Sequence, residues 1–119
     1  MKLPLQEAHH QALLMELAEW DGYVSSALLG VEAVRACARY GEKYVEDARA
    51  WLGDVALLPL DDALLDDATA LRPAGLRSLD AIHLATALSI RDEIGVFLTY
   101  DERLGMAAAG CGLNVVEPS

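Results

Sequence analysis

Residues 78–88 read SLDAIHLATAL, a mostly apolar stretch that holds a single charged residue, Asp80. Serine is favoured at helix N-caps, so we expect a helix that begins near Ser78 and runs to about Arg91. Asp80 then lies in the first turn, where the positive end of the helix dipole favours a carboxylate. This placement alone explains Asp80. The alternative is that Asp80 belongs to a cluster of carboxylates that shares a purpose, because a charge among apolar residues otherwise costs free energy.

The rest of the chain alternates between helical patterns and short apolar runs. We expect strands at Tyr23–Ser25, Val55–Leu60, Gly95–Thr99 and Leu113–Val116. We expect helices at Leu5–Trp20, from a Ser26 cap to Tyr40, at Glu42–Leu52, from an Asp61 or Asp62 cap to Leu71, and from Asp101 to Ala109. Continuous apolar strands joined by short connections are typical of a parallel sheet with helices on both faces. The predicted fold class is therefore α/β, with three layers and a mainly parallel sheet.

Length and composition limit the possible functions. The 119 residues suffice for a single domain, residues 1–119, and the net charge of −10 has the wrong sign for a passive nucleic-acid binder. No apolar run is long enough to cross a bilayer, and the first ten residues, MKLPLQEAHH, lack the apolar core of a signal peptide. Two distant cysteines favour free thiols. We therefore expect a cytoplasmic protein with no membrane partner.

Three carboxylates are expected to meet at one edge of this sheet. Ligands of parallel sheets bind outside the carboxyl ends of the strands, where loops lead into helices. Glu32, Asp80 and Asp101 all lie near the starts of helices that can face this edge. Three ionised carboxylates need cationic compensation, and oxygen ligands without thiolates select a hard cation such as Mg²⁺ or Mn²⁺. Such a site suits metal-dependent hydrolysis of a phosphodiester.

Three segments together resemble a known family. They are SSALLGVEAVRACARY, LRSLDAIHLATAL and FLTYDERLGMAAAGCGLNVV, and in this order they are similar to PIN-domain ribonucleases, specifically the toxin member of VapBC toxin–antitoxin pairs. The resemblance implies an Mg²⁺- or Mn²⁺-dependent endoribonuclease that acts on RNA and is inhibited by a VapB-type antitoxin. By position, Glu32, Asp80 and Asp101 match the catalytic, metal-holding acids, and Thr99 matches a hydroxyl residue that supports the metal site.

The chain departs from this family at its start. The family opens with a central strand that ends in an Asp-Thr-Ser-like motif, whereas this sequence begins MKLPLQEAHH. We expect a start that is truncated relative to the family; the alternative is a degenerate paralogue, a PIN-like interaction module that binds without cleaving. Residues 1–119 are then expected to be nearly inactive on RNA. The sheet is expected to have a gap, to close by direct pairing of the neighbouring strands, or to borrow a strand, as a homodimer or higher oligomer.

Several of these residues also have simpler interpretations. Glu32 could pair with Arg35 or Arg39 on its own helix face, and these arginines could instead bind RNA phosphate or the antitoxin. Asp101 could serve only as a helix N-cap. His83 follows Asp80 by one turn, but a single histidine in an apolar helix is expected to be a core or interface residue rather than a ligand. The run DDALLDDATAL is expected to be a solvated acidic face or an antitoxin contact.

Overall fold

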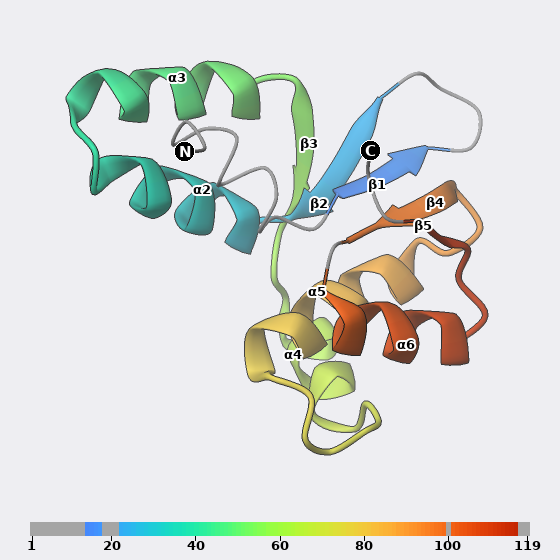
Figure 1. The fold of residues 1–119 in the computed structure, drawn as a ribbon. Coiled ribbons are helices and arrows are strands. Elements are labelled where there is room, and N and C mark those ends of the chain that lie inside the picture. The colour runs from blue at the N-terminus through green and yellow to red at the C-terminus, as the bar shows by residue number, and fades with distance from the viewer. Residues whose placement is uncertain (1–13, 18–21, 100, 117–119) are drawn as a thin grey trace.

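The computed structural model describes residues 14–17, 22–99 and 101–116. Figure 1 shows the elements of this part of the chain. In chain order they are β1 (Leu14–Leu17), β2 (Tyr23–Ser26), α2 (Leu28–Ala38), α3 (Glu42–Leu52), β3 (Val55–Leu58), α4 (Asp62–Thr69), α5 (Ser78–Ser89), β4 (Ile94–Leu98), α6 (Glu102–Gly110) and β5 (Val115–Val116). The order of helices and strands after residue 22 is the one predicted from the sequence.

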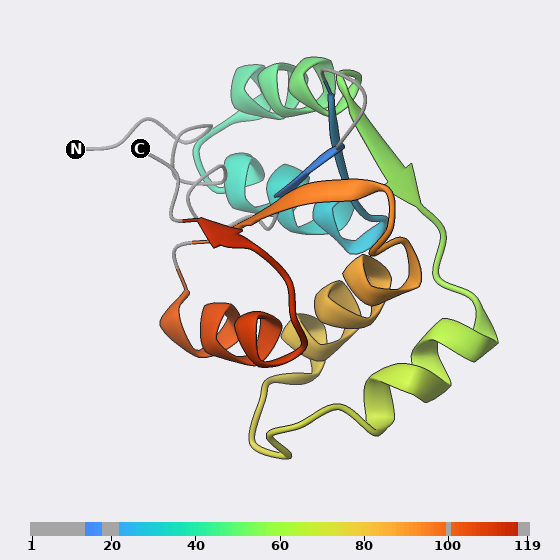
Figure 2. The ribbon, with the colours of Figure 1, turned by 90° about the vertical axis from the view of Figure 1, so that its right-hand side faces the viewer.

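The described strands form one sheet in the order β3-β2-β1-β4-β5. The β2–β3 and β4–β5 pairs are parallel, and β1 is antiparallel to both β2 and β4. It follows that β2, β3, β4 and β5 all run in one direction. Helices α2 and α3 lie on one face of the sheet, and α5 and α6 lie on the other (Figure 2). The predicted three-layer α/β fold with a mainly parallel sheet is therefore confirmed.

The central strand β1 corrects two expectations. The predicted helix Leu5–Trp20 is wrong over Leu14–Leu17, and its other residues lie outside the described ones. The sheet also has neither a gap nor direct pairing between β2 and β4, since this chain's own Leu14–Leu17 fills the central position without a borrowed strand. The physical reason is tertiary: a strand here pairs with the backbone groups of both β2 and β4, and Met15 becomes fully buried. These gains outweigh the helix propensity of Leu, Met and Glu.

The two faces of the sheet have separate hydrophobic cores. On one face, Met15 and Phe97 of the sheet pack with Leu84 of α5 and Leu104 of α6. On the other, residues of α2 and α3 pack around β3, with Leu29, Ala33, Cys37, Ala48 and Val55 buried. Helix α4 packs against α5 rather than against the sheet, through Leu64, Ala68, Ala81 and Ala85. The ends of β2 and β4 thus fix where α2 and α6 begin, and the packing of α5 against the sheet places its first turn.

Two of the four expected N-cap residues are observed at the helix starts, and the other two are not. The Asp61 and Asp101 side chains cap α4 and α6 by accepting from the backbone N–H groups of Leu64 and Leu104. Ser78, however, is the first residue of α5, after an Arg77 N-cap without a side-chain hydrogen bond, and the N-cap of α2 is Ala27 rather than Ser26. In the described part of the chain no helix is long and apolar enough to span a bilayer.

Candidate active site

Glu32 comes from the helix that follows β2. The strand ends at Ser26, and the Ala27 N–H donates to the Leu58 carbonyl of β3 at 2.8 Å, which ties the turn to the sheet. The Ser26 hydroxyl oxygen accepts from the Leu28 N–H at 3.3 Å and so helps to satisfy the first turn of α2. Glu32 lies one turn further on, with a half-exposed side chain. Glu32 is thereby held near the carboxyl end of β2.

Asp101 comes from the helix that follows β4. Its Oδ1 accepts from the Leu104 N–H at 2.9 Å, so the N-cap interpretation of Asp101 is confirmed. The buried Thr99 accepts a hydrogen bond on Oγ1 from the Asp101 N–H at 3.1 Å, and so shapes the turn between strand and helix. A cap bond occupies one oxygen of the carboxylate, and Asp101 is exposed. Because β2 and β4 run in the same direction, Asp101 and Glu32 follow strand ends at the same edge of the sheet.

Asp80 lies in the first turn of α5, and the charges of Asp101 and Glu32 both act on its carboxyl group. Burial raises the pKa of the Asp80 carboxyl above its ordinary value, and the negative charge of Asp101 raises it further. His83 and Arg77 lower this pKa, and the charge of Glu32 raises it by a smaller amount. Asp80 is therefore close enough to Asp101 and to Glu32 for the charges of both acids to act on it, although the three residues are distant in the sequence.

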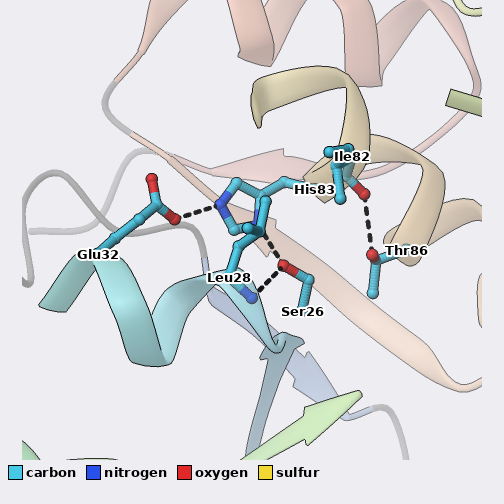
Figure 3. A network of polar contacts seen from close by, with 6 residues as sticks. All are labelled: Ser26, Leu28, Glu32, Ile82, His83 and Thr86. Atoms are coloured by element: carbon cyan, nitrogen blue, oxygen red, sulfur yellow. Dashed lines mark hydrogen bonds and ion pairs between the residues drawn. The ribbon is translucent and has the colours of Figure 1, made fainter. Parts of the chain in front are cut away.

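His83 and Ser26 join this site in a way that the sequence analysis missed. His83 is 3% exposed, its Nε2 lies 2.6 Å from Glu32 Oε1, and its Nδ1 lies 3.0 Å from Ser26 Oγ. Figure 3 shows the imidazole of α5 between Glu32 of α2 and the end of β2. Since an ionised carboxylate can only accept, Nε2 donates its N–H to Glu32. The expectation that His83 is a core residue is confirmed by its burial. Its contact with Glu32 was not expected, and the available sequence signal for a place in this site was its spacing of three residues from Asp80.

Arg35 and Arg39 line a shallow cavity beside Glu32. The cavity has a volume of about 500 Å³ and is bounded by α2 and by Leu79 of α5. Both arginines are exposed, and within the described residues Glu32 forms its ion pair with His83 rather than with either arginine. The alternative interpretation, in which Glu32 pairs along its own helix, is therefore not what the described residues show. Both guanidinium groups lie at the rim of the cavity.

The donors at this edge suit a hard cation but do not form a complete set. They are carboxylate oxygens, which Mg²⁺ and Mn²⁺ prefer. Burial is the main cause of the raised pKa of Asp80, and the negative charge of Asp101, which a cation would neutralise, is the second. Among residues 14–17, 22–99 and 101–116, however, no group of three or more His, Cys, Asp or Glu side chains is arranged to hold a metal ion. The chemistry of the donors therefore fits a divalent cation, although these side chains are not already gathered around one.

Comparisons with known proteins identify the family of the chain. The PIN domain family model matches residues 3–109. Ribonuclease VapC46 of Mycobacterium tuberculosis is 40% identical over 119 residues, which cover all of this chain and 92% of the relative. Ribonuclease VapC47 of the same species is 41% identical over 107 residues, 89% of this chain and 79% of the relative. No solved structure shows a significant match. The chain belongs to the PIN-domain family and, within it, to the VapC type.

Proposed function

We propose that this protein is a metal-dependent endoribonuclease, the toxin of a type II toxin–antitoxin system. The observation that supports the proposal is that Asp80 lies near enough to both Asp101 and Glu32, at the carboxyl edge of the sheet, for their negative charges to act on it. An excess of carboxylates at one place is stable only with cationic compensation, and a site of this kind serves phosphodiester hydrolysis. The names of the relatives, ribonuclease VapC46 and ribonuclease VapC47, support RNA as the substrate class.

Each residue has a distinct task in this proposal. Asp80, Asp101 and Glu32 would hold Mg²⁺ or Mn²⁺ as catalytic ligands, and Thr99 supports them by fixing the turn that carries Asp101. A divalent cation in such a site lowers the pKa of a water nucleophile and neutralises charge on the phosphoryl oxygens. Arg77, whose charge acts on Asp80, offsets part of the negative field that an approaching phosphate meets. The net charge of −10 makes this local compensation necessary.

The partners follow from the same surfaces. We propose that a VapB-type antitoxin covers the acidic edge, with an arginine among the carboxylates, because bidentate arginine–carboxylate pairs are strong. The cavity beside Glu32 exposes Val31 and Leu79 next to Arg35 and Arg39, a mixture that suits a protein partner or RNA phosphate. A cytoplasmic location and a homodimer or higher oligomer complete the proposal. Light scattering after size-exclusion chromatography tests the oligomer, and a monomer at all concentrations would contradict it.

RNA cleavage tests the activity. The assay incubates residues 1–119 at high protein concentration with RNA, in the presence of Mg²⁺ or Mn²⁺ and in the presence of EDTA. We expect weak cleavage that needs a divalent cation, and we expect Asp80→Asn to abolish it. Asp67→Asn, the same change at an exposed position of α4, should leave cleavage intact. Cleavage that persists in Asp80→Asn would refute the assignment of Asp80.

Metal binding separates the nuclease from a non-catalytic interaction module. Calorimetric titration of residues 1–119 with Mn²⁺ should show binding that Asp101→Asn removes and Asp67→Asn retains. Asn at position 101 can still accept a hydrogen bond as an N-cap, so a loss of binding would reflect the missing charge rather than a frayed helix. Absence of binding at millimolar Mn²⁺ would favour the interaction module.

A further inference from the structure

His83 is held on both of its ring nitrogens. Nε2 meets Glu32 Oε1 at 2.6 Å, and Nδ1 meets Ser26 Oγ at 3.0 Å. The Ser26 oxygen also accepts from the Leu28 N–H at 3.3 Å, so its own hydrogen is free to point at Nδ1. A continuous set of hydrogen bonds thus runs from the backbone of α2 through Ser26 and the imidazole to the Glu32 carboxylate (Figure 3).

The arrangement excludes His83 as a cation ligand in this geometry. A histidine binds a metal through the lone pair of one ring nitrogen, but one nitrogen here faces a carboxylate and the other faces a hydroxyl. The imidazole is also buried, with an exposed fraction of 3%. The ring therefore acts on Glu32 and not on a bound ion.

We propose that His83 is a positioning residue that holds the Glu32 carboxylate in the orientation needed for metal binding. This inference rests on the proposed function. A half-exposed glutamate on a helix surface samples several rotamers, whereas a hydrogen bond to one oxygen restricts the carboxylate and leaves the second oxygen for a cation. Carboxylate ligands in metal sites are commonly held by such outer hydrogen bonds, and loss of one typically lowers metal affinity about 10–100-fold.

Ser26 fixes the imidazole in turn. It is fully buried at the end of β2, where it is paired with Leu58 of β3. The imidazole that donates to Glu32 is therefore attached through Ser26 to a strand of the sheet rather than to a surface group. This chain of contacts joins β2, α5 and α2, the three elements that bring Glu32 and Asp80 to one edge.

Two amide substitutions separate the two ends of the imidazole. His83→Gln places an N–H₂ donor near the position of Nε2, toward Glu32, whereas His83→Asn places its polar atoms near Nδ1, toward Ser26. Each variant of residues 1–119 is titrated with Mn²⁺ and followed by electron paramagnetic resonance, and each is melted without metal. We expect His83→Gln to keep the wild-type Mn²⁺ affinity within about threefold and His83→Asn to weaken it about 10–100-fold. Both variants should melt below wild type, since each loses one of the two contacts.

A merely structural histidine would give a different pattern. Equal Mn²⁺ affinities for His83→Gln, His83→Asn and wild type, or equal losses in the two variants, would overturn the positioning role. In a Glu32→Gln background, His83→Asn should cause no further loss of affinity, and an additional loss there would also overturn it. If either amide variant fails to fold, Ser26→Ala, which removes only the hydroxyl oxygen, is titrated in its place. A weaker Mn²⁺ affinity is then expected, and an unchanged affinity would refute the positioning role of His83. Wild-type protein without Mn²⁺ binding would instead reject the proposed function itself.

Discussion

The contact between Glu32 and His83 should stabilise the fold as well as the site. His83→Leu removes a charge-assisted hydrogen bond of 2.6 Å whose histidine end is 3% exposed and whose glutamate end is 37% exposed. Such bonds contribute about 1.5–3 kcal/mol when buried, and solvent at Glu32 reduces the expected coupling to about 1–2 kcal/mol. The buried Ser26 hydroxyl also loses a partner, at about 1 kcal/mol. The total cost of about 2–3 kcal/mol corresponds to a Tm lower by about 8–12 °C in a chain of this length.

A double-mutant cycle measures the coupling directly. Urea unfolding of wild type, His83→Leu, Glu32→Ala and the double variant should give a coupling of about 1–2 kcal/mol. The matched control is the cycle of Glu32→Ala with Arg35→Ala, residues three apart on α2, which should give at most about 0.5 kcal/mol. A coupling below about 0.5 kcal/mol for the His83 pair, or a larger one for the Arg35 pair, would refute the geometry described above.

Substitutions at three other positions test separate parts of the account. Burial and the charge of Asp101 raise the pKa of Asp80, so the folded state binds more protons than the unfolded chain between pH 3.8 and the raised pKa, and stability falls as pH rises through that window. Asp80→Asn should therefore raise the Tm at pH 7, and a gain that persists below pH 3.8 would contradict this origin. Asp101→Ala should cost about 1 kcal/mol in urea unfolding through the lost α6 cap, whereas Asp101→Asn should cost little; equal costs would argue against the cap. Met15→Ala should cost about 2–5 kcal/mol in the same assay, and a cost below about 1 kcal/mol would contradict the central position of β1.

Much of the fold could be predicted from local patterns because local chemistry decides it. The α3 helix has the predicted bounds, Glu42–Leu52, since Gly41 and Gly53 flank a strongly helical run. The β2 and β4 strands lie within one residue of their predicted positions, because β-branched and aromatic residues are bounded there by turns. The positions of Glu32 and Asp101 beyond the ends of β2 and β4, at one edge of the sheet, also followed from a general rule, since strands that run in the same direction place their carboxyl ends together.

The missed features depend on contacts between distant segments. Nothing within Leu14–Leu17 itself favours a strand, and its conformation depends on unpaired backbone groups of β2 and β4 that lie elsewhere in the sequence. The Glu32–His83 contact joins residues 51 positions apart, whereas the helical spacing of Arg35 suggested a nearer partner. Burial decides between them: His83 cannot reach water and takes the carboxylate, while the exposed Arg35 keeps its hydration.

The most direct test of the shared carboxylate site is anomalous diffraction from crystals of this protein soaked in Mn²⁺. The account predicts one anomalous peak at the carboxyl edge of the sheet, with oxygens of Asp80 and Asp101 as ligands at about 2.0–2.2 Å and Glu32 in contact with the ion or its water. A peak elsewhere on the acidic surface, or none at this edge under saturating Mn²⁺, would contradict it.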